Sequence, residues 1–272
     1  MLGLLLIVTM LANYLATELP GQMAVNEGDH ELQVENQLLR LGSLLRGAAA
    51  SGALGAQLSQ PISLGSQGEP PFAPPSGGAI GPGVAGSSMY ATFTVSGPTT
   101  LTQTTSGAPG AAFVLRLENV YSPQGYFAYD EGAIVYAQPN GVPVLLVTPN
   151  VTYADAKLSV WMPEFVSTIG TEVGVGVASL SVRLVSLLNI SLPDDNYELS
   201  GSTTLKVVSP YAQAWWSFFN STIPSVTATC SSTVKNACDG PFLSSLPLGT
   251  VAVTVPATAL AIQVATFGVS LS

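Results

Sequence analysis

The sequence predicts an α+β protein, in which a long, kinked, hydrophobic N-terminal helix precedes an all-β, sandwich-like head domain with one short helix. Three observations lead to this prediction. Residues 1–17 contain no charged side chain. From residue 89 onward the apolar residues recur with a period of two, which is typical of half-buried strands. The aromatic-rich stretch 209–222 interrupts that period and indicates a short helix between strands.

Residues 1–54 are expected to form the N-terminal helix. As a helix, the uncharged opening segment would be about 25 Å long, near the lower limit for crossing the roughly 30 Å hydrocarbon core of a membrane. Pro20 and Gly21 are expected to kink or break this helix, because proline lacks an N–H group and clashes with the preceding turn. The helical pattern then resumes, with a four-three-four spacing of apolar residues along one face: Val34, Leu38, Leu41 and Leu45.

Residues 55–88 are rich in Pro and Gly and contain one charged residue, Glu69. This composition predicts a connector, and therefore a domain boundary, between the helix and a head of residues 89–272. The connector is expected to lie extended on the protein, because four of its apolar side chains need cover: Ile62, Leu64, Phe72 and Ile80.

Ten segments of the head favour β-strand, because they are rich in β-branched and aromatic residues and are separated by turn signals. They are residues 89–95, 111–120, 133–138, 142–148, 157–162, 173–188, 202–209, 226–230, 250–255 and 261–271. Strands in this number favour a sandwich or two packed sheets. The helix at 209–222 is expected to cover an open end of the sheets with buried aromatic side chains; a platform for stacking on sugars is the alternative.

The low charge of the chain limits its function. Charged residues make up 8% of the sequence, and the formal net charge is −9. Nucleic acid is excluded as a partner, because a nucleic-acid-binding surface must be basic. A surface built mainly from Ser, Thr, Asn, Gln and Gly suits an extracellular protein. An acidic habitat is a further hypothesis, since most carboxylates are neutral below about pH 3.

Cysteine usage and sequons also favour export. Cys230 and Cys238 flank a short polar loop and are expected to form a disulfide in an oxidising compartment. Two thiols and one histidine do not complete a tetrahedral zinc site, so no metal is expected. Three N-x-S/T sequons are candidate glycosylation sites: Asn150, Asn189 and Asn220.

Candidate catalytic groups are few. The one histidine, His30, lies among acids on the amphipathic helix and is expected to be exposed there. A Ser-His-Asp arrangement would need it beside a serine of the head. The acid pairs 130–131 and 194–195 lie in turn contexts, where solvated carboxylates are expected; calcium binding or glycosidase chemistry are weaker alternatives. We therefore expect no catalytic residue, no cofactor and no enzymatic activity.

The uncharged opening helix, its amphipathic continuation and the β head together resemble a type IV pilin-like subunit, as in archaeal pilins and archaellins. Bacterial type IV pilins have a glutamate at the fifth mature position, where this chain has Leu5, a departure that archaeal members allow. In this family a short basic leader is removed before the hydrophobic stretch, so Met1 is expected to be either the mature start or a true initiator.

A closer resemblance to uncharacterised pilin-like archaeal surface proteins runs along most of the 272 residues. It is carried by four stretches: "LPGQMAVNEGDHELQVENQLLRLGSLL", "ISLGSQGEPPFAPPSGG", "VTPNVTYAD" and "SPYAQAWWSFF". This resemblance implies a cell-surface location and assembly, and no biochemical activity.

The expected function is therefore that of a structural subunit of an extracellular filament used for adhesion or cell-to-cell contact. The subunit would lie in the membrane before assembly, interact with the pilus assembly machinery, and then polymerise with copies of itself. The residues expected to form the filament core are Leu2, Leu4, Leu5, Leu6, Ile7, Val8, Met10, Leu11 and Leu15. A membrane-anchored monomer or minor pilin that acts as a binding module is the alternative, and a secreted hydrolase is the third class.

Overall fold

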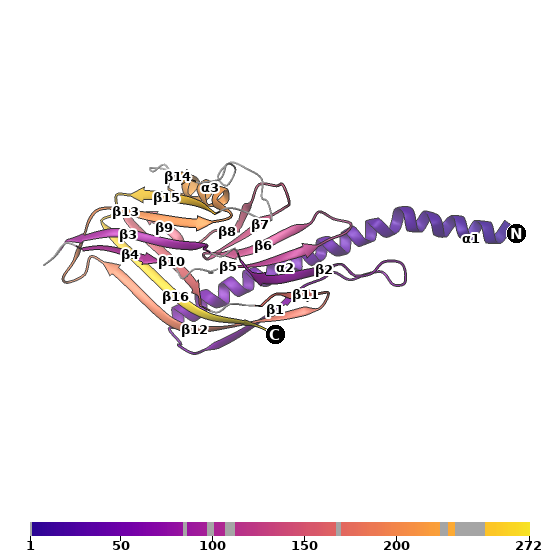
Figure 1. The fold of residues 1–272 in the computed structure, drawn as a ribbon, viewed down its shortest axis with the longest axis horizontal. Helices are drawn as coiled ribbons and strands as arrows, with labels where there is room; N and C mark the ends of the chain where they lie inside the picture. Colours follow the sequence, from indigo (N-terminus) through magenta and orange to yellow (C-terminus); the bar gives the residue numbers. More distant parts are fainter. Residues whose placement is uncertain are drawn as a thin grey trace.

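The structure is a computed structural model that describes residues 2–83, 86–96, 101–106, 112–166, 170–223, 228–231 and 248–272. It confirms the predicted fold class, a long N-terminal helix followed by a β-rich head with one short helix (Figure 1). The helical elements are α1 Leu2–Asn13, the π-helical turn η1 Tyr14–Glu18, α2 Leu19–Ser51 and α3 Ala212–Thr222.

The strands of the head alternate with short turns. They are β1 Gln57–Ser63, β2 Gly77–Pro82, β3 Ser88–Ser96, β4 Leu101–Ser106, β5 Ala112–Glu118, β6 Gly125–Asp130, β7 Ala133–Ala137, β8 Val144–Val147, β9 Val151–Ala154, β10 Lys157–Phe165, β11 Glu172–Gly174, β12 Val177–Leu192, β13 Glu198–Ser209, β14 Thr229–Ser231, β15 Gly249–Val255 and β16 Ala259–Leu271.

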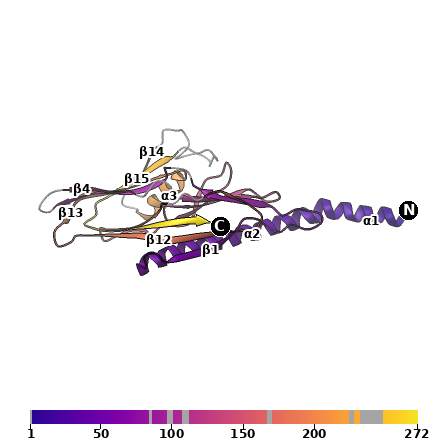
Figure 2. The same cartoon turned by 60° about the horizontal axis from the view of Figure 1, so that its bottom comes forward.

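The N-terminal helix is helical from residue 2 to residue 51, and α1 projects away from the head (Figures 1 and 2). The predicted break at Pro20 and Gly21 is wrong, since both residues lie inside the first turn of α2. The irregularity is η1, one turn upstream, where the Leu19 backbone N–H bonds to the Tyr14 carbonyl. We attribute this wider turn to Pro20, whose ring would clash with the preceding turn of a regular α-helix.

The C-terminal half of the helix packs on the head through a continuous buried face. Its members are spaced three or four residues along the helix, except for the adjacent pairs 41–42 and 48–49. They are Leu19, Met23, Glu27, His30, Val34, Leu38, Leu41, Gly42, Leu45, Ala48 and Ala49. The predicted apolar face is therefore confirmed. The helix ends at Gly52, whose φ of 64° is left-handed and whose N–H bonds to the Ala49 carbonyl.

The described strands form three sheets rather than two. Their strand orders are β1-β12-β16-β10-β9, β11-β2-β5-β6-β7-β8 and β14-β15-β13-β3-β4. Neighbouring strands are antiparallel except for β10 and β16, which run parallel. The long antiparallel pairing of β12 with β16 lies in the interior of the first sheet.

The segment expected to be a connector is part of the sheets. Its first strand, β1, pairs with β12, and its second strand, β2, lies between β11 and β5. The side chains of Ile62, Leu64 and Ile80 are buried as expected, whereas Phe72 is exposed. Residues 55–88 therefore do not form a boundary between two domains.

Two apolar cores hold the head together. One core joins α2 to the strands that face it, with Leu38, Phe113 and Phe267 among its buried members. The other lies beneath α3, where Trp215 and Phe219 are fully buried. The prediction that the aromatic helix caps the core is confirmed.

Candidate assembly interface

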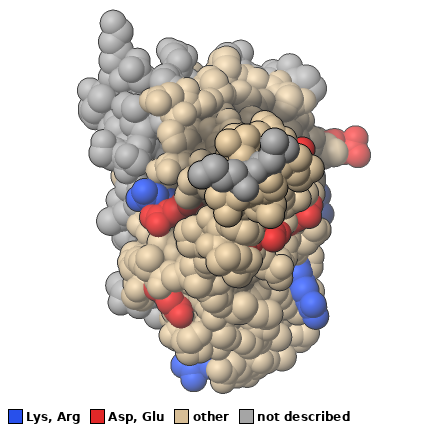
Figure 3. Space-filling view, turned by 90° about the vertical axis from the view of Figure 1, so that its right-hand side faces the viewer, with Lys and Arg blue, Asp and Glu red and all other residues tan. Residues whose placement is uncertain are grey.

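The N-terminal segment exposes its apolar side chains around its whole circumference. The exposed fractions lie between 39% and 73% for Leu4, Leu5, Leu6, Ile7, Val8, Met10, Leu11 and Leu15. These are the predicted filament-core residues apart from Leu2, whose side chain lies outside the described residues. The end view in Figure 3 shows a largely uncharged surface with isolated charged groups. An apolar surface of this extent indicates an interaction surface.

The helix Gly3–Ser51 is long and apolar enough to cross a membrane, by length and composition. Only 6% of its most apolar 18-residue window is buried within the protein, so the head does not cover this segment. Its polar groups suit such surroundings: the Thr9 hydroxyl donates to the Leu5 carbonyl at 2.7 Å, and the Thr17 hydroxyl to the Asn13 carbonyl at 2.8 Å. Each hydroxyl therefore has a partner within its own helix.

Contact between the helix and the head begins at η1. The Tyr14 ring meets the Phe72 ring edge to face, with centroids 5.7 Å apart. One turn later, Leu19 and Met23 form a small buried cluster with Ala73. Glu18 is exposed beside this cluster. The part of the helix that the head leaves uncovered is therefore α1 and most of η1.

A buried carboxylate anchors α2 to the head. Glu27 is fully buried, and its two oxygens accept backbone N–H bonds from Val120, Tyr121 and Ser122 at 2.8, 2.8 and 2.6 Å. Three consecutive N–H groups directed at one carboxylate form an anion-binding nest. No local pattern in the sequence distinguishes this residue from the other acids of the helix.

The expectation of an exposed His30 is wrong. Its ring is buried, and Nε2 lies 3.2 Å from the Ser63 carbonyl, while Nδ1 has no hydrogen-bond partner among the described residues. Burial lowers the pKa of His30. Its hydrogen-bond contact among the described residues is a backbone carbonyl and not a serine hydroxyl, and the carboxylates of Glu27 and Glu31 are close enough to act on its charge.

The first acid pair is not solvated, contrary to expectation. Asp130 and Glu131 lie at the two-residue turn between β6 and β7, and both are fully buried. Asp130 Oδ2 accepts hydrogen bonds from the Ser209 hydroxyl at 2.6 Å and from Trp215 Nε1 at 2.9 Å. Both carboxylate oxygens of Glu131 are unpartnered among the described residues.

Burial is the main cause of the pKa shifts in this pair. It raises the pKa of Asp130 to about 6, against the opposing effect of its two hydrogen bonds. It also raises the pKa of Glu131, to which the nearby carboxylates of Asp130 and Glu164 add. The second pair behaves as expected: Asp194 is exposed in a turn, where its Oδ1 accepts the N–H groups of Asn196 and Tyr197.

The candidate modification sites lie on the head. Asn150 and Asn189 are exposed and lie along the same hollow of the β12-β16-β10 sheet, and the Asn189 side chain accepts from Gln263 at 3.0 Å. Asn220 is half-buried at the end of α3 and accepts the Ala228 N–H. Cys230 lies in β14, but Cys238 lies outside the described residues, so the disulfide stays a prediction.

No group of three or more His, Cys, Asp or Glu among the described residues has the arrangement of a metal site. A scan against protein-family models and searches of curated proteins and of solved structures found no match to this chain. Of the arrangements described, the exposed apolar helix gives the clearest indication of function. Its length and composition are compatible with crossing a membrane.

Proposed function

We propose that this chain is a structural subunit of an extracellular, type IV pilus-like filament, assembled through its N-terminal helix and used for adhesion. The observation that carries the proposal is the exposure of the apolar side chains from Leu4 to Leu15 on a helix that projects beyond the head. The resemblance of the sequence to archaeal pilin-like proteins supports it.

Burial of this surface supplies the energy of assembly. Each Leu or Ile side chain transferred from water to an apolar environment contributes about 1.5–3 kcal/mol. Lipid supplies that environment before assembly, which requires insertion in the membrane. The helices of other copies supply it afterwards, when a repeated contact that does not close generates a helical polymer. The heads then form the outer surface, as their polar, weakly charged composition permits.

The proposal is tested by substituting Leu5→Asp in the organism that makes the protein. Leu5 is exposed and makes no contact with the head, so the variant head is expected to keep its thermal unfolding temperature, while filaments disappear from negative-stain images of shed material. The control is Ser186→Asp, which places the same charge on exposed sheet surface of β12. Filaments of normal number and appearance in the Leu5→Asp strain would contradict the proposal.

A membrane-anchored monomer or minor pilin is the second candidate, because the same exposed helix would serve as an anchor. The two are separated by sedimentation of sheared surface material without detergent. A filament subunit sediments as fibres, whereas an anchored monomer stays with the membrane until detergent is added. A variant that starts at Gly21 is expected to be soluble and monomeric, and fibres formed by that variant would contradict both candidates.

A further inference from the structure

The loop between β1 and β2 carries an apolar tip at the point where the N-terminal helix leaves the head. Residues 70–75 read Pro-Pro-Phe-Ala-Pro-Pro, and all of their side chains are exposed except that of Ala73. After Glu69, the next charged residue in the chain is Arg116. Figure 1 shows this loop extending beyond the sheets along the helix, on the side of α1. We call residues 70–75 the apolar tip.

Each backbone N–H group of the apolar tip has an acceptor within the loop. Four of the six residues are prolines, which have no N–H group. The other two, Phe72 and Ala73, both donate to the Glu69 carbonyl, at 2.8 and 2.9 Å. The Ala73 carbonyl in turn accepts the Glu69 N–H at 3.0 Å. A backbone whose donors are satisfied internally can enter hydrocarbon without losing hydrogen bonds from those donors to water.

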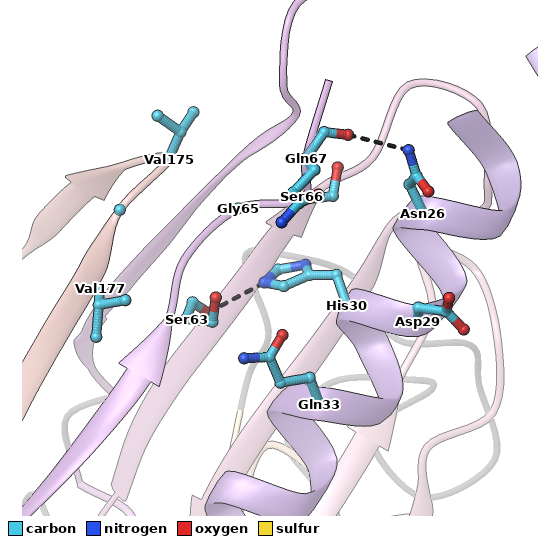
Figure 4. A pocket seen from close by; sticks show the side chains of 11 residues that line it. Asn26, Asp29, His30, Gln33, Ser63, Gly65, Ser66, Gln67, Val175 and Val177 are labelled. Carbon is cyan, nitrogen blue, oxygen red and sulfur yellow. Dashed lines mark hydrogen bonds between the residues drawn. The ribbon is translucent and has the colours of Figure 1, made fainter. Parts of the chain in front are cut away.

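Close packing at the base of the loop holds the apolar tip in place. A Cβ atom on Gly68 would lie 2.5 Å from the Pro75 backbone nitrogen and 2.6 Å from the Ala73 carbonyl oxygen, so the two sides of the loop touch there. The Asn26 side chain of α2 donates to the Gln67 carbonyl at 3.4 Å, beside the polar pocket drawn in Figure 4. The tip is therefore a built feature of the head, attached to the helix.

The contact between Phe72 and Tyr14 places the apolar tip beside the uncharged part of the helix. The two rings meet edge to face, with centroids 5.7 Å apart. Tyr14 precedes Glu18, the first charged residue of the chain, by four residues, or about 6 Å along a helix. The uncharged residues 1–17 are about 25 Å long, somewhat less than the roughly 30 Å hydrocarbon core. A bilayer that covers residues 1–17 therefore also reaches the Phe72 ring.

The composition of the loop favours the hydrocarbon of a lipid bilayer as the partner of the apolar tip. The sequence between Arg46 and Arg116 contains no Lys or Arg, so attraction to anionic headgroups does not hold the tip. Its nearest charged neighbour in the chain, Glu69, is half-buried and accepts a bond from the Asn26 amide at 3.4 Å. Through the Tyr14 contact the tip continues the apolar surface of α1, so lipid that covers α1 also covers the tip.

We propose that the apolar tip inserts into the membrane leaflet nearest the head, where Phe72 and the four prolines contact lipid beside α1. This inference rests on the proposed function, in that α1 lies in the membrane before assembly. The tip adds apolar surface where the uncharged part of the helix is shorter than the hydrocarbon core. Because the tip is attached to the head, its insertion also fixes the distance between the head and the bilayer.

The test measures contact with lipid by the tryptophan fluorescence of the full-length chain in phosphatidylcholine nanodiscs that hold one copy each. Phe72→Trp places a reporter on the apolar tip, and Pro74→Trp places a second one that leaves the Phe72 ring unchanged. Ile7→Trp is the reporter in α1. Some of the lipid carries bromine on its acyl chains, which quenches tryptophan in contact with it. The native chain, whose three tryptophans lie in the head, gives the background emission.

The emission added at either tip position is expected to be quenched by bromine close to the headgroups. The matched control is Val120→Trp, an exposed apolar position on the loop after β5, which is expected to stay unquenched. The Val120 N–H bonds to Glu27, which follows Tyr14 by thirteen residues, or about 20 Å along a helix. Unquenched emission at both tip positions, or equally strong quenching at Val120→Trp, would overturn the inference.

The α1 reporter distinguishes failure of this inference from failure of the proposed function. Quenching of Ile7→Trp without quenching at the tip would leave α1 in the membrane and overturn only the inference. Unquenched emission of Ile7→Trp would contradict the membrane stage of the proposed function, and the inference with it. A second copy of the chain is the other possible partner of the tip. In that case the tip emission would shift to shorter wavelength only in discs that hold several copies, which would also overturn the inference.

Discussion

The Glu27 carboxylate on α2 lies 2.8 Å from the backbone nitrogen of Tyr121, a residue 94 positions away in the chain. This bond and its two neighbours join the helix to the loop between β5 and β6, within the buried face of α2 that begins at Leu19. The carboxylate is fully buried, and its hydrogen-bond donors are the N–H groups of a partly exposed loop. Glu27 thus adds a polar anchor to the apolar packing of α2 on the head.

Replacement of this side chain is expected to be costly. Glu27→Ala removes the acceptor of three backbone N–H groups and leaves a cavity at a fully buried position, so we expect the free energy of unfolding to fall by about 2–4 kcal/mol. Denaturant unfolding of the detergent-solubilised chain measures the loss. Glu35→Ala on the same helix serves as the control and should change stability by about 0.5 kcal/mol or less. Equal effects of the two substitutions would show that the nest contributes nothing.

The stability of the protein is expected to fall as the pH rises through 6. The folded pKa of Asp130, about 6, lies above its ordinary value of 3.8, so the folded state retains a proton that the unfolded chain has lost. This contribution is fully present below about pH 4 and is lost as pH rises through the folded pKa, a change of about 3 kcal/mol. Glu131 acts in the same direction. Thermal unfolding from pH 3 to pH 8 measures the trend, and the hypothesis of an acidic habitat stays a prediction.

The substitution of Glu131 by its amide isolates the contribution of this carboxyl group to the pH dependence of stability. Glu131→Gln removes the ionisable group with little change in shape, so we expect higher stability at pH 8 and no change at pH 3. Glu198→Gln, at an exposed position of β13, is the matched control with no pH-dependent effect. A Glu131→Gln variant that is equally stable or less stable at pH 8 would disprove the buried-charge explanation.

Two glycine substitutions are expected to act in opposite directions. A Cβ atom at Gly78 would overlap the Leu64 carbonyl and lie 2.8 Å from the Arg116 carbonyl, so Gly78→Ala should destabilise the head by about 2 kcal/mol or more. Gly28 lies within α2 with open space around it, so Gly28→Ala should stabilise the helix by about 0.5–1 kcal/mol. The unfolding temperatures of both variants are compared with that of the native chain. An unchanged unfolding temperature for Gly78→Ala would contradict the close packing at β2.

The same glycine explains why part of the fold was not predictable. Gly-rich sequence ordinarily indicates a flexible connector, but β2 is rich in glycine because two backbones approach it closely. Pro61 similarly argued against a strand, yet β1 is at the edge of its sheet, where a missing N–H is tolerated. Local composition cannot distinguish these packed strands from a linker, because the segments that pack against them are distant in the sequence.

The helix, its buried face and most later strands followed from periodicity, which is a local property. The buried acids did not, since an Asp-Glu-Gly turn has the composition of a solvated one, and only the three-dimensional structure places Trp215 and Ser209 over Asp130. The burial of His30 was not predicted for the same reason, because no residue near it in the sequence indicates that Ser63 is its partner. The apolar surface of α1 was predictable, because no charged residue interrupts it.

The π-helical turn at Tyr14–Glu18 has a geometric consequence for the whole subunit. One residue more in a single turn rotates everything N-terminal to it by about 100° about the axis, relative to an uninterrupted α-helix. The number of residues between α1 and the contacts of the helix with the head therefore determines the direction in which each leucine side chain of α1 points relative to the head. Deletion of a single residue there would point every leucine in a new direction while leaving the composition of α1 unchanged.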